Sequence, residues 1–471
     1  MKTILIFIAS GFVAKNILQT DLYKTLITDK NLRIVLLAPH NKFEYFRKNY
    51  ASERLIVESL PRERRNSLFY YYNIISRSSI HTNSSTISQY RDYYLNSNKS
   101  LIYRLTLLSI RRMAWFLGQF KFWRKALGFI YIVFAKSIYS QLFTKYQPDL
   151  IYLTALFHTE EWKLLRETKI RKIKTLYQVA GWDNPSSKVY LPIFPDYILA
   201  ANEMVKNDLV EYSLFPEDRI YVIGFPQYDI YFAKNNIIPR EEFFRKMNAD
   251  PRKKLMLYGM INPKNMPYNI KILEMIDEYI KINDLSDSWQ VLFRPYPSLI
   301  NLQYQEEELA RKNKKFIFDY SVATAMEGNQ FEFSNEDTAH LANSLYHSDI
   351  VISIFSTILN EAAIFGKPIV SIAFSGKPET TKKDYYESPR RRLGYVHVKK
   401  LFKDNKWIIA GNKEELFKAL DIHLSNPEKY KEKISKMSDE HCCHPRIGSG
   451  LFAGNKILEL LNKKNKIYER W

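Results

Sequence analysis

The segment from Asp349 to Pro368 contains the residues whose types and spacing best suit chemistry. An apolar run, DIVISIF, is followed at once by Ser356 and Thr357, and then by a helical pattern that carries Glu361. A helix that begins beside two small hydroxyls presents free N–H groups and a positive dipole end, which bind anions such as phosphate. Glu361, one turn into that helix, is placed to accept hydrogen bonds from a ribose. An ordinary capped helix with an incidental glutamate is the alternative interpretation.

Two further residues of the second half follow apolar runs directly. Arg294 ends the run WQVLFR, where a guanidinium suits a diphosphate, with a surface ion pair as the alternative. Gly259 ends KLMLYG, where the missing side chain lets a phosphate approach the backbone, unless the glycine only makes a turn. Three consecutive arginines are a further candidate for phosphate binding, namely Arg390, Arg391 and Arg392. They either bind donor or lipid phosphates or are simply solvated.

Two residues of the first half are candidate general bases. His158 follows the apolar run LIYLTAL, and Glu160 and Glu161 are near enough in sequence to orient its ring. Asp183, in the loop GWDNPSSK, is placed to deprotonate an acceptor hydroxyl. A histidine without a catalytic role and a simple Asp-Asn-Pro-Ser-Ser turn are the alternatives, so the base stays open between the two residues.

Alternating strand and helix patterns must position these residues. Continuous apolar runs predict buried parallel strands, each followed by a helical pattern. Between about Arg62 and Lys145 the pattern is largely helical, with a polar loop near 79–88. The strands are expected at 2–9, 32–39, 148–156, 174–182, 195–203 and from 218 in the first half, and at 254–260, 289–298, 314–321, 349–357, 367–374 and 406–411 in the second.

Two successive arrays of this kind predict an α/β protein with two Rossmann-like, doubly wound domains that face each other across a cleft. We expect a first domain at 1–231 with a helical insertion at about 62–145, and a second at 255–448. The polar, charged segment 232–254 is predicted to link them. A C-terminal helix at 449–471 is expected to pack back on the first domain.

The formal net charge of +20 indicates anionic partners. Between Asp92 and Asp149 there is no acidic residue, while nine lysines and arginines alternate with aromatic side chains. A basic, aromatic-rich helical stretch is typical of a surface that lies on an anionic membrane, and a solvated face over core aromatics is the alternative. Nucleic acid is not an expected partner, because no zinc finger, RNP-type strand or helix-turn-helix pattern occurs.

The cysteines and the N-terminus bear on the compartment. Cys442 and Cys443 are adjacent, which excludes a disulfide framework and fits a reducing compartment. The contiguous ligands of HCCH do not converge easily on one ion, so no metal is expected. The opening run KTILIFIA fits a first strand better than a signal peptide. We therefore expect a cytoplasmic protein, soluble or peripheral on the inner face of the plasma membrane.

Several motifs resemble those of glycosyltransferases with the GT-B fold that build bacterial surface polysaccharides, a superfamily that includes CDP-glycerol glycerophosphotransferase-like and UDP-glycosyltransferase-like enzymes. RPYPS resembles their R-x-H-P stretch, with Tyr296 in place of the histidine. GWDNPSSK resembles W-D-N-x-x-S-K, and IGFPQYD resembles G-x-P-x-x-D. Ser10 and Gly11, with Asn16, fit the opening strand and helix. The matching donor-binding element comprises Asp349, Ser356, Thr357, Glu361, Gly366, Lys367 and Pro368.

The resemblance implies transfer of a sugar from a nucleotide-activated donor to a surface-polysaccharide, lipid-linked or protein acceptor, without a metal or other cofactor. The donor nucleotide would bind Gly259, Arg294, Ser356, Thr357 and Glu361. The acceptor would bind near Gly11, Asn16, Trp182 and Asn184, with His158 or Asp183 as the base. The alternatives are a nucleotide-sugar 2-epimerase of the same architecture and a non-catalytic, membrane-associated polysaccharide-assembly protein.

Overall fold

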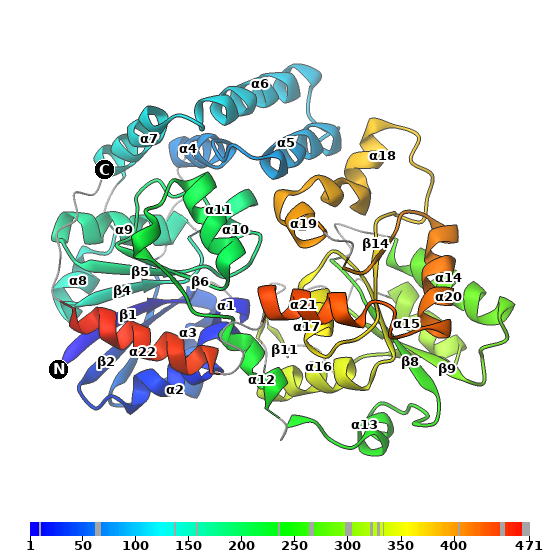
Figure 1. Ribbon diagram of the computed structural model, residues 1–471. Helices are drawn as coiled ribbons and strands as arrows, with labels where there is room; N and C mark the ends of the chain where they lie inside the picture. The colour runs from blue at the N-terminus through cyan, green and yellow to red at the C-terminus, as the bar shows by residue number, and fades with distance from the viewer. Residues whose placement is uncertain are drawn as a thin grey trace. The chain divides into compact units, whose positions relative to one another are not determined.

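The computed structural model divides into two α/β units (Figure 1). The first unit comprises residues 1–227 and 444–471, and the second comprises residues 228–443. The structure describes residues 1–8, 11–61, 67–135, 138–156, 159–233, 236–262, 268–296, 304–320, 324–326, 330–332, 334–403, 406–442 and 448–463.

The first unit is built on a seven-stranded sheet with the order β3-β2-β1-β4-β5-β6-β7. All its paired strands are parallel, and most consist of apolar residues because helices cover both faces. The edge strand β3 is an element that the sequence analysis missed, because its run LIVES is short and only partly buried. The strands are β1 (Lys2–Phe7), β2 (Leu32–Ala38), β3 (Leu55–Ser59), β4 (Leu150–Leu153), β5 (Lys174–Gln178), β6 (Tyr197–Ala200) and β7 (Ile220–Val222).

The C-terminal helix α22 (Ser449–Asn462) packs on the first unit, against α2 (Asp21–Thr28) and the sheet. Its buried side chains Ile457 and Leu460 join the same apolar core as Ile4. Lys174 Nζ donates to the carbonyls of Leu460 and Lys463, both at 2.6 Å, and so supplies positive charge at the helix C-terminus. The sheet is also covered by α1 (Gly11–Leu18), α3 (Phe43–Tyr50), α9 (Thr159–Arg171), α10 (Asn184–Ser187) and α11 (Glu203–Ser213).

The insertion of the first unit is helical, as its pattern predicts. The polar loop expected near 79–88 is wrong in extent, because α5 already begins at Asn83. The Thr82 hydroxyl caps this helix by accepting the N–H of Ser85, so the small polar residues start a helix rather than extend a loop. Figure 1 shows α6 and α7 on the outer side of α4 and α5. The helices are α4 (Ser67–Ser78), α5 (Asn83–Leu95), α6 (Leu101–Leu117), α7 (Lys121–Phe134) and α8 (Ser140–Tyr146).

The second unit contains a six-stranded parallel sheet with the order β10-β9-β8-β13-β14-β15, and a separate hairpin of β11 and β12. The strands are β8 (Lys254–Gly259), β9 (Trp289–Arg294), β10 (Phe316–Phe318), β11 (Thr324–Met326), β12 (Gln330–Glu332), β13 (Ile350–Ile354), β14 (Ile369–Ile372) and β15 (Ile408–Ala410). The helices are α12 (Asp229–Phe232), α13 (Arg240–Lys246), α14 (Asn269–Ile282), α15 (Tyr304–Lys312), α16 (Asn335–His347), α17 (Thr357–Ile364), α18 (Lys382–Glu387), α19 (Val396–Leu401), α20 (Lys413–Ser425) and α21 (Lys431–His441).

The charged segment 232–254 belongs to the second unit, and the division between the units falls at 227/228. Its helix α13 buries Phe243 and Phe244. The Arg240 guanidinium lies 4.1 Å from the Phe244 ring and donates to the carbonyls of His347 and Lys253, both at 2.8 Å. Buried aromatics and these hydrogen bonds attach the segment to the second unit, although its composition resembles that of a linker.

Candidate functional site

The strand order of the second sheet reverses between β8 and β13. Ligands of doubly wound sheets bind beyond the carboxyl ends of the strands at such a point. Gly259, the last residue of β8, pairs in register with Ser353 of β13 on one side and with Arg294 of β9 on the other. Ser356 and Thr357 follow β13. The structure therefore brings predicted donor residues from three neighbouring strands to one edge of the sheet.

The N-terminus of α17 has the features of an anion site. Ser356 is its N-cap residue, with extended backbone, and its hydroxyl makes no capping hydrogen bond within this fully described helix. Thr357 is exposed in the first turn, where backbone N–H groups have no intrahelical acceptor. Arg392 Nη1 donates to the carbonyl of Phe355 at 2.7 Å, which brings a guanidinium beside this helix end. Arg392 was only one of three arginines in the sequence interpretation, and its contact with Phe355 distinguishes it.

Gly259 permits a close approach between β8 and α17. A Cβ atom at this position would lie 2.9 Å from Ile358 Cδ1 and 3.2 Å from Ser353 Oγ. The Ser353 hydroxyl also donates to the Gly259 carbonyl at 2.7 Å. The space that a side chain would occupy is thus filled by the first turn of α17, so the glycine sets the position of that helix end.

Glu361 is buried in α17 and lies near the hydroxyl of Tyr231 from α12. Burial raises the pKa of Tyr231 well above its usual range, the negative charge of Glu361 raises it further, and the positive charge of Arg294 acts in the opposite direction. The three side chains are therefore close enough to interact, although they come from three separate elements. No pattern in the sequence indicates a role for Tyr231, because a tyrosine just after the motif IGFPQYD carries no sign of its tertiary neighbours.

Arg294 is held by a buried carboxylate. Its Nη1 lies 2.7 Å from Asp319 Oδ2, and His340 Nε2 from α16 lies 2.9 Å from Asp319 Oδ1. Burial alone would raise the pKa of Asp319, but the charge of Arg294 and the hydrogen bond from His340 outweigh it and lower that pKa. Tyr296 occupies the position where the resembling families have a histidine. Asp319, the partner of Arg294, is also bound by the imidazole of His340, which no local pattern in the sequence indicates.

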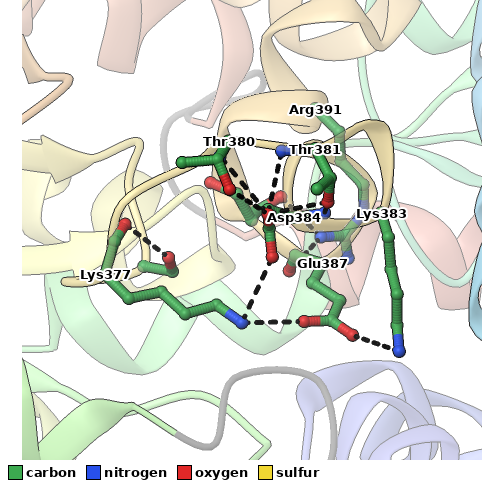
Figure 2. Close-up of polar contacts among 9 residues, drawn as sticks. Lys377, Thr380, Thr381, Lys383, Asp384, Glu387 and Arg391 are labelled. Atoms are coloured by element: carbon green, nitrogen blue, oxygen red, sulfur yellow. Dashed lines mark hydrogen bonds and ion pairs between the residues drawn. The ribbon is translucent and has the colours of Figure 1, made fainter.

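Figure 2 shows the polar contacts around α18, which order the segment before Arg392. The Asp384 carboxylate accepts from Thr381 and Thr380, and the Thr381 contacts lower the pKa of Asp384 to about 2. Lys377 Nζ lies 3.0 Å from Glu387 Oε2. Arg391 is buried and donates to the carbonyl of Glu387 at 2.9 Å, and Arg390 pairs with Glu379 at 3.0 Å. Arg390 and Arg391 thus have structural contacts.

In the first unit, Glu161 binds the backbone that follows β4. Its carboxylate accepts the N–H groups of Thr154 at 2.8 Å, Ala155 at 3.0 Å and Leu156 at 2.5 Å. Burial raises the pKa of Glu161 to about 7, against the effect of these three donors. Trp162 Nε1 donates to the Leu156 carbonyl at 2.7 Å. Glu161 therefore fixes the chain before position 157 rather than standing free as a partner for a histidine, and His158 itself lies outside the described residues.

The loop after β5 contains the other candidate base. Asp183 Oδ2 lies 2.5 Å from Lys188 Nζ, and the Asp183 carbonyl accepts from the Ser187 hydroxyl at 2.6 Å. The Tyr177 hydroxyl, 3.4 Å from the Ala155 carbonyl, also hydrogen-bonds Asn184. Burial and the charge of Glu161 raise the pKa of Tyr177 well above its usual range. Tyr177 thus connects the loops that follow β4 and β5.

The remaining predicted acceptor residues lie at the same edge of the first sheet. Trp182 lies in the loop after β5 and Asn184 is the first residue of α10, and both are buried. Gly11 begins α1 after β1, and Asn16 is half-buried in the same helix. The Thr154 hydroxyl donates to the carbonyl of Phe7 at 2.7 Å and so joins the ends of β4 and β1, between which the strand order reverses.

Within the described ranges, no group of three or more His, Cys, Asp or Glu side chains is arranged to hold a metal ion. Cys442 is buried, and its thiol donates to the Asn360 carbonyl at 3.7 Å. None of the helices in the described part of the chain is long and apolar enough to span a bilayer.

Comparison with solved structures identifies the fold. Over 98% of its length the chain is similar to the UDP-GlcNAc 2-epimerase of Neisseria meningitidis bound to UDP-GlcNAc, with 13% identity, all of that chain covered and a TM-score of 0.53. A glycosyltransferase from Rickettsia africae gives 14% identity, 99% coverage of both chains and a TM-score of 0.52. The wall teichoic acid polymerase TagF, in a structure with CDPG, gives 13% identity, coverage of 98% and 88%, and a TM-score of 0.50.

The sequence itself matches no model of a protein family, and no curated protein is similar to it. The structural likeness extends over nearly the whole chain, and the two parallel sheets of seven and six strands agree with it. The protein therefore has a two-unit α/β fold of the GT-B type, as the two arrays of strands and helices predict.

Proposed function

We propose that this protein transfers a sugar from a nucleotide-activated donor to a hydroxyl of a surface-polysaccharide, lipid-linked or protein acceptor, without a metal. The observation that carries the proposal is the convergence of the α17 N-terminus, Arg294 and Glu361 at the point where the second sheet reverses its strand order. Solved structures of the same fold with UDP-GlcNAc and with CDPG support a nucleotide-linked donor.

In the proposed donor site, different groups bind the diphosphate and the ribose of the nucleotide. The diphosphate is bound by the free N–H groups of α17 and by Arg294 and Arg392, which stabilise the negative charge that develops on the leaving group. Glu361 accepts hydrogen bonds from the ribose. Asp319 and His340 hold the Arg294 guanidinium in one orientation before the donor binds.

For the acceptor side we propose His158 as the base, with Asp183 as the competing residue. The carboxylate of Asp183 already pairs with Lys188, whose Nζ lies 2.5 Å from Oδ2, so it is less available to an acceptor hydroxyl. A histidine changes protonation state near neutral pH and therefore suits proton abstraction from a hydroxyl. Gly11, Asn16, Trp182 and Asn184 are the proposed acceptor contacts at the edge of the first sheet.

Donor binding and turnover by variants of the second unit test the proposal. Thermal shift with UDP, CDP and GDP sugars identifies the donor, because a bound ligand stabilises the fold. We expect Arg294→Ala and Glu361→Gln to lose most of the shift and the transfer activity, while Glu428→Gln, an exposed matched control, keeps both. Wild-type activity in both site variants would remove the site assignment. Interconversion of the free donor without an acceptor would instead identify a nucleotide-sugar epimerase.

We further propose that the helical insertion contacts an anionic membrane surface. The segment 93–148 has no acidic residue. Its described helices are not long and apolar enough to cross a bilayer, so in this proposal they lie on the bilayer surface. Large apolar side chains on α6 and α7 are more than half exposed, namely Leu101, Ile102, Met113, Phe116, Phe122, Phe129, Val133 and Phe134. Sedimentation with anionic vesicles tests this contact, which Phe122→Ser with Phe129→Ser is expected to abolish.

A further inference from the structure

The first unit carries a pocket of about 430 Å³ beside the first turn of α7. One part of its lining is basic and consists of Lys121, Arg124, Lys125, Lys169 and Arg219. The other part is apolar and consists of Leu191, Pro192, Phe194, Leu214 and Pro216. Of the described residues that line it, none is acidic. A ligand that matches both parts carries negative charge at one end and an apolar group at the other.

The two arginines of the pocket are held in place by contacts within the unit. Arg124 Nε donates to the Gly118 carbonyl at 2.9 Å, and its Nη2 donates to the Tyr212 carbonyl at 2.5 Å. Arg219 is buried, with its guanidinium 5.3 Å from the centre of the Phe215 ring. Because these charges are already fixed, an anion that binds them does not have to order them first. Lys121 and Lys125 are exposed and adjust to the ligand.

The basic part of the pocket adjoins the exposed apolar side chains of α7. Lys125 lies three residues after Phe122 and four before Phe129, so the three side chains share one face of the helix. Both phenylalanines are more than half exposed. A ligand in the pocket would therefore lie beside the surface that we propose to contact a membrane.

We propose that this pocket binds the phosphate head group of an anionic phospholipid. The lysines and arginines of the pocket bind the phosphate, and its apolar lining contacts the adjoining glycerol and acyl groups. Phe122 and Phe129 insert into the membrane interface. The inference deepens the membrane contact proposed above and rests on it. A free phosphate would satisfy the charges of Arg124 and Lys169 but would leave the apolar wall unused, which favours the lipid.

Titration calorimetry with dihexanoyl phosphatidylglycerol, kept below its micellar concentration, tests the proposal on the full chain. We expect saturable binding, and much weaker binding of dihexanoyl phosphatidylcholine and of inorganic phosphate. Lys121→Gln with Lys125→Gln removes two exposed charges and is expected to weaken phosphatidylglycerol binding about 30-fold. The control Lys30→Gln with Lys48→Gln removes two exposed charges elsewhere on the unit, outside the segment 93–148, and is expected to bind like the wild type. Lys169→Gln provides a second pocket variant.

Four results would overturn the proposal: no saturable binding, equal affinity for phosphatidylcholine, equal affinity for inorganic phosphate, or equal losses in the pocket and control variants. Melting temperatures equal to that of the wild type confirm that the variants are folded. The nucleotide thermal shift is measured on the same proteins, since the donor residues lie in the second unit. A failure of lipid binding with the nucleotide shift intact rejects only this inference, and the converse result rejects only the donor site.

Discussion

Arg294 and Asp319 form a buried ion pair in the second unit, with Nη1 and Oδ2 2.7 Å apart and side chains that are 8% and 1% exposed. His340 binds the second carboxylate oxygen of Asp319. Arg294 is the last residue of β9, and Asp319 directly follows β10. The ion pair therefore joins the ends of two neighbouring strands. The Arg294 guanidinium is therefore held in one orientation by side chains of the second unit itself.

Replacement of Asp319 by Asn is expected to destabilise the β9 region by about 3–5 kcal/mol, because it leaves the Arg294 charge buried without its counterion. Hydrogen exchange of the β9 amides measures this change locally. Asp250→Asn, which breaks an ion pair with the exposed Arg252, is the control and should leave these amides unchanged. Because the pKa of Asp319 is lowered in the folded protein, the ionised carboxylate stabilises the fold at pH values above its usual pKa of 3.8. This stabilisation is lost as the pH falls below that value. Equal exchange in both variants would contradict the prediction.

Glu161 should make the stability of the first unit fall as the pH rises from 4.5 to about 7. Its folded pKa of about 7 is above the usual value of 4.5, so the folded state holds the proton more tightly. The stabilisation is complete at pH values below the usual pKa of 4.5 and is lost as the pH rises through the folded pKa of about 7. The free energy of unfolding should therefore fall by about 3 kcal/mol over this range. Denaturation at pH 5 and pH 8 measures it. Glu161→Gln should reduce this difference, and an unchanged difference would show that Glu161 does not titrate in this range.

Gly454→Ala is expected to destabilise the first unit by about 1–3 kcal/mol, because α22 approaches α2 too closely for a side chain at this position. The added Cβ would lie 2.6 Å from the Cβ of Thr25. The neighbouring Gly450 meets the backbone N of Leu22 at 2.8 Å in the same way. Leu451→Ala, at an exposed position of the same helix, is the control and should change the melting temperature little. A stabilised Gly454→Ala protein would mean that the helices separate easily.

Gly259→Ala is expected to weaken donor binding and to destabilise the second unit by about 1–3 kcal/mol, since the new Cβ meets Ile358 and displaces the α17 N-terminus. Ile358→Ala removes both methyl groups that the new Cβ would contact. The double variant should therefore lose less free energy of unfolding than the two single variants lose in sum. Gly411→Ala, whose Cβ meets the flexible ends of the Glu415 and Arg390 side chains, serves as the control. Strict additivity of the two changes would show that the contact does not determine the effect.

Local patterns determined much of the architecture. Continuous apolar runs such as those ending at Gly259 and Arg294 predicted strands buried on both faces, and the structure confirms them as β8 and β9. Because parallel strands share one direction, residues after each run had to gather at one sheet edge, which predicted the neighbourhood of Gly259, Arg294 and Ser356. These inferences succeed because they depend on residues that are close in sequence.

Tertiary packing decided the rest. Asp319 is 25 residues from Arg294, and Lys174 is 286 residues from the Leu460 carbonyl that it binds. Neither partner carries a local sign of the other, because both contacts join residues that only the folded chain brings together. Glu161 likewise resembled a histidine partner in the sequence, and only the fold directed its carboxylate to the backbone after β4. The sequence alone thus determined which elements form and where the sheet edges lie, while the tertiary structure decided which charged side chains meet there.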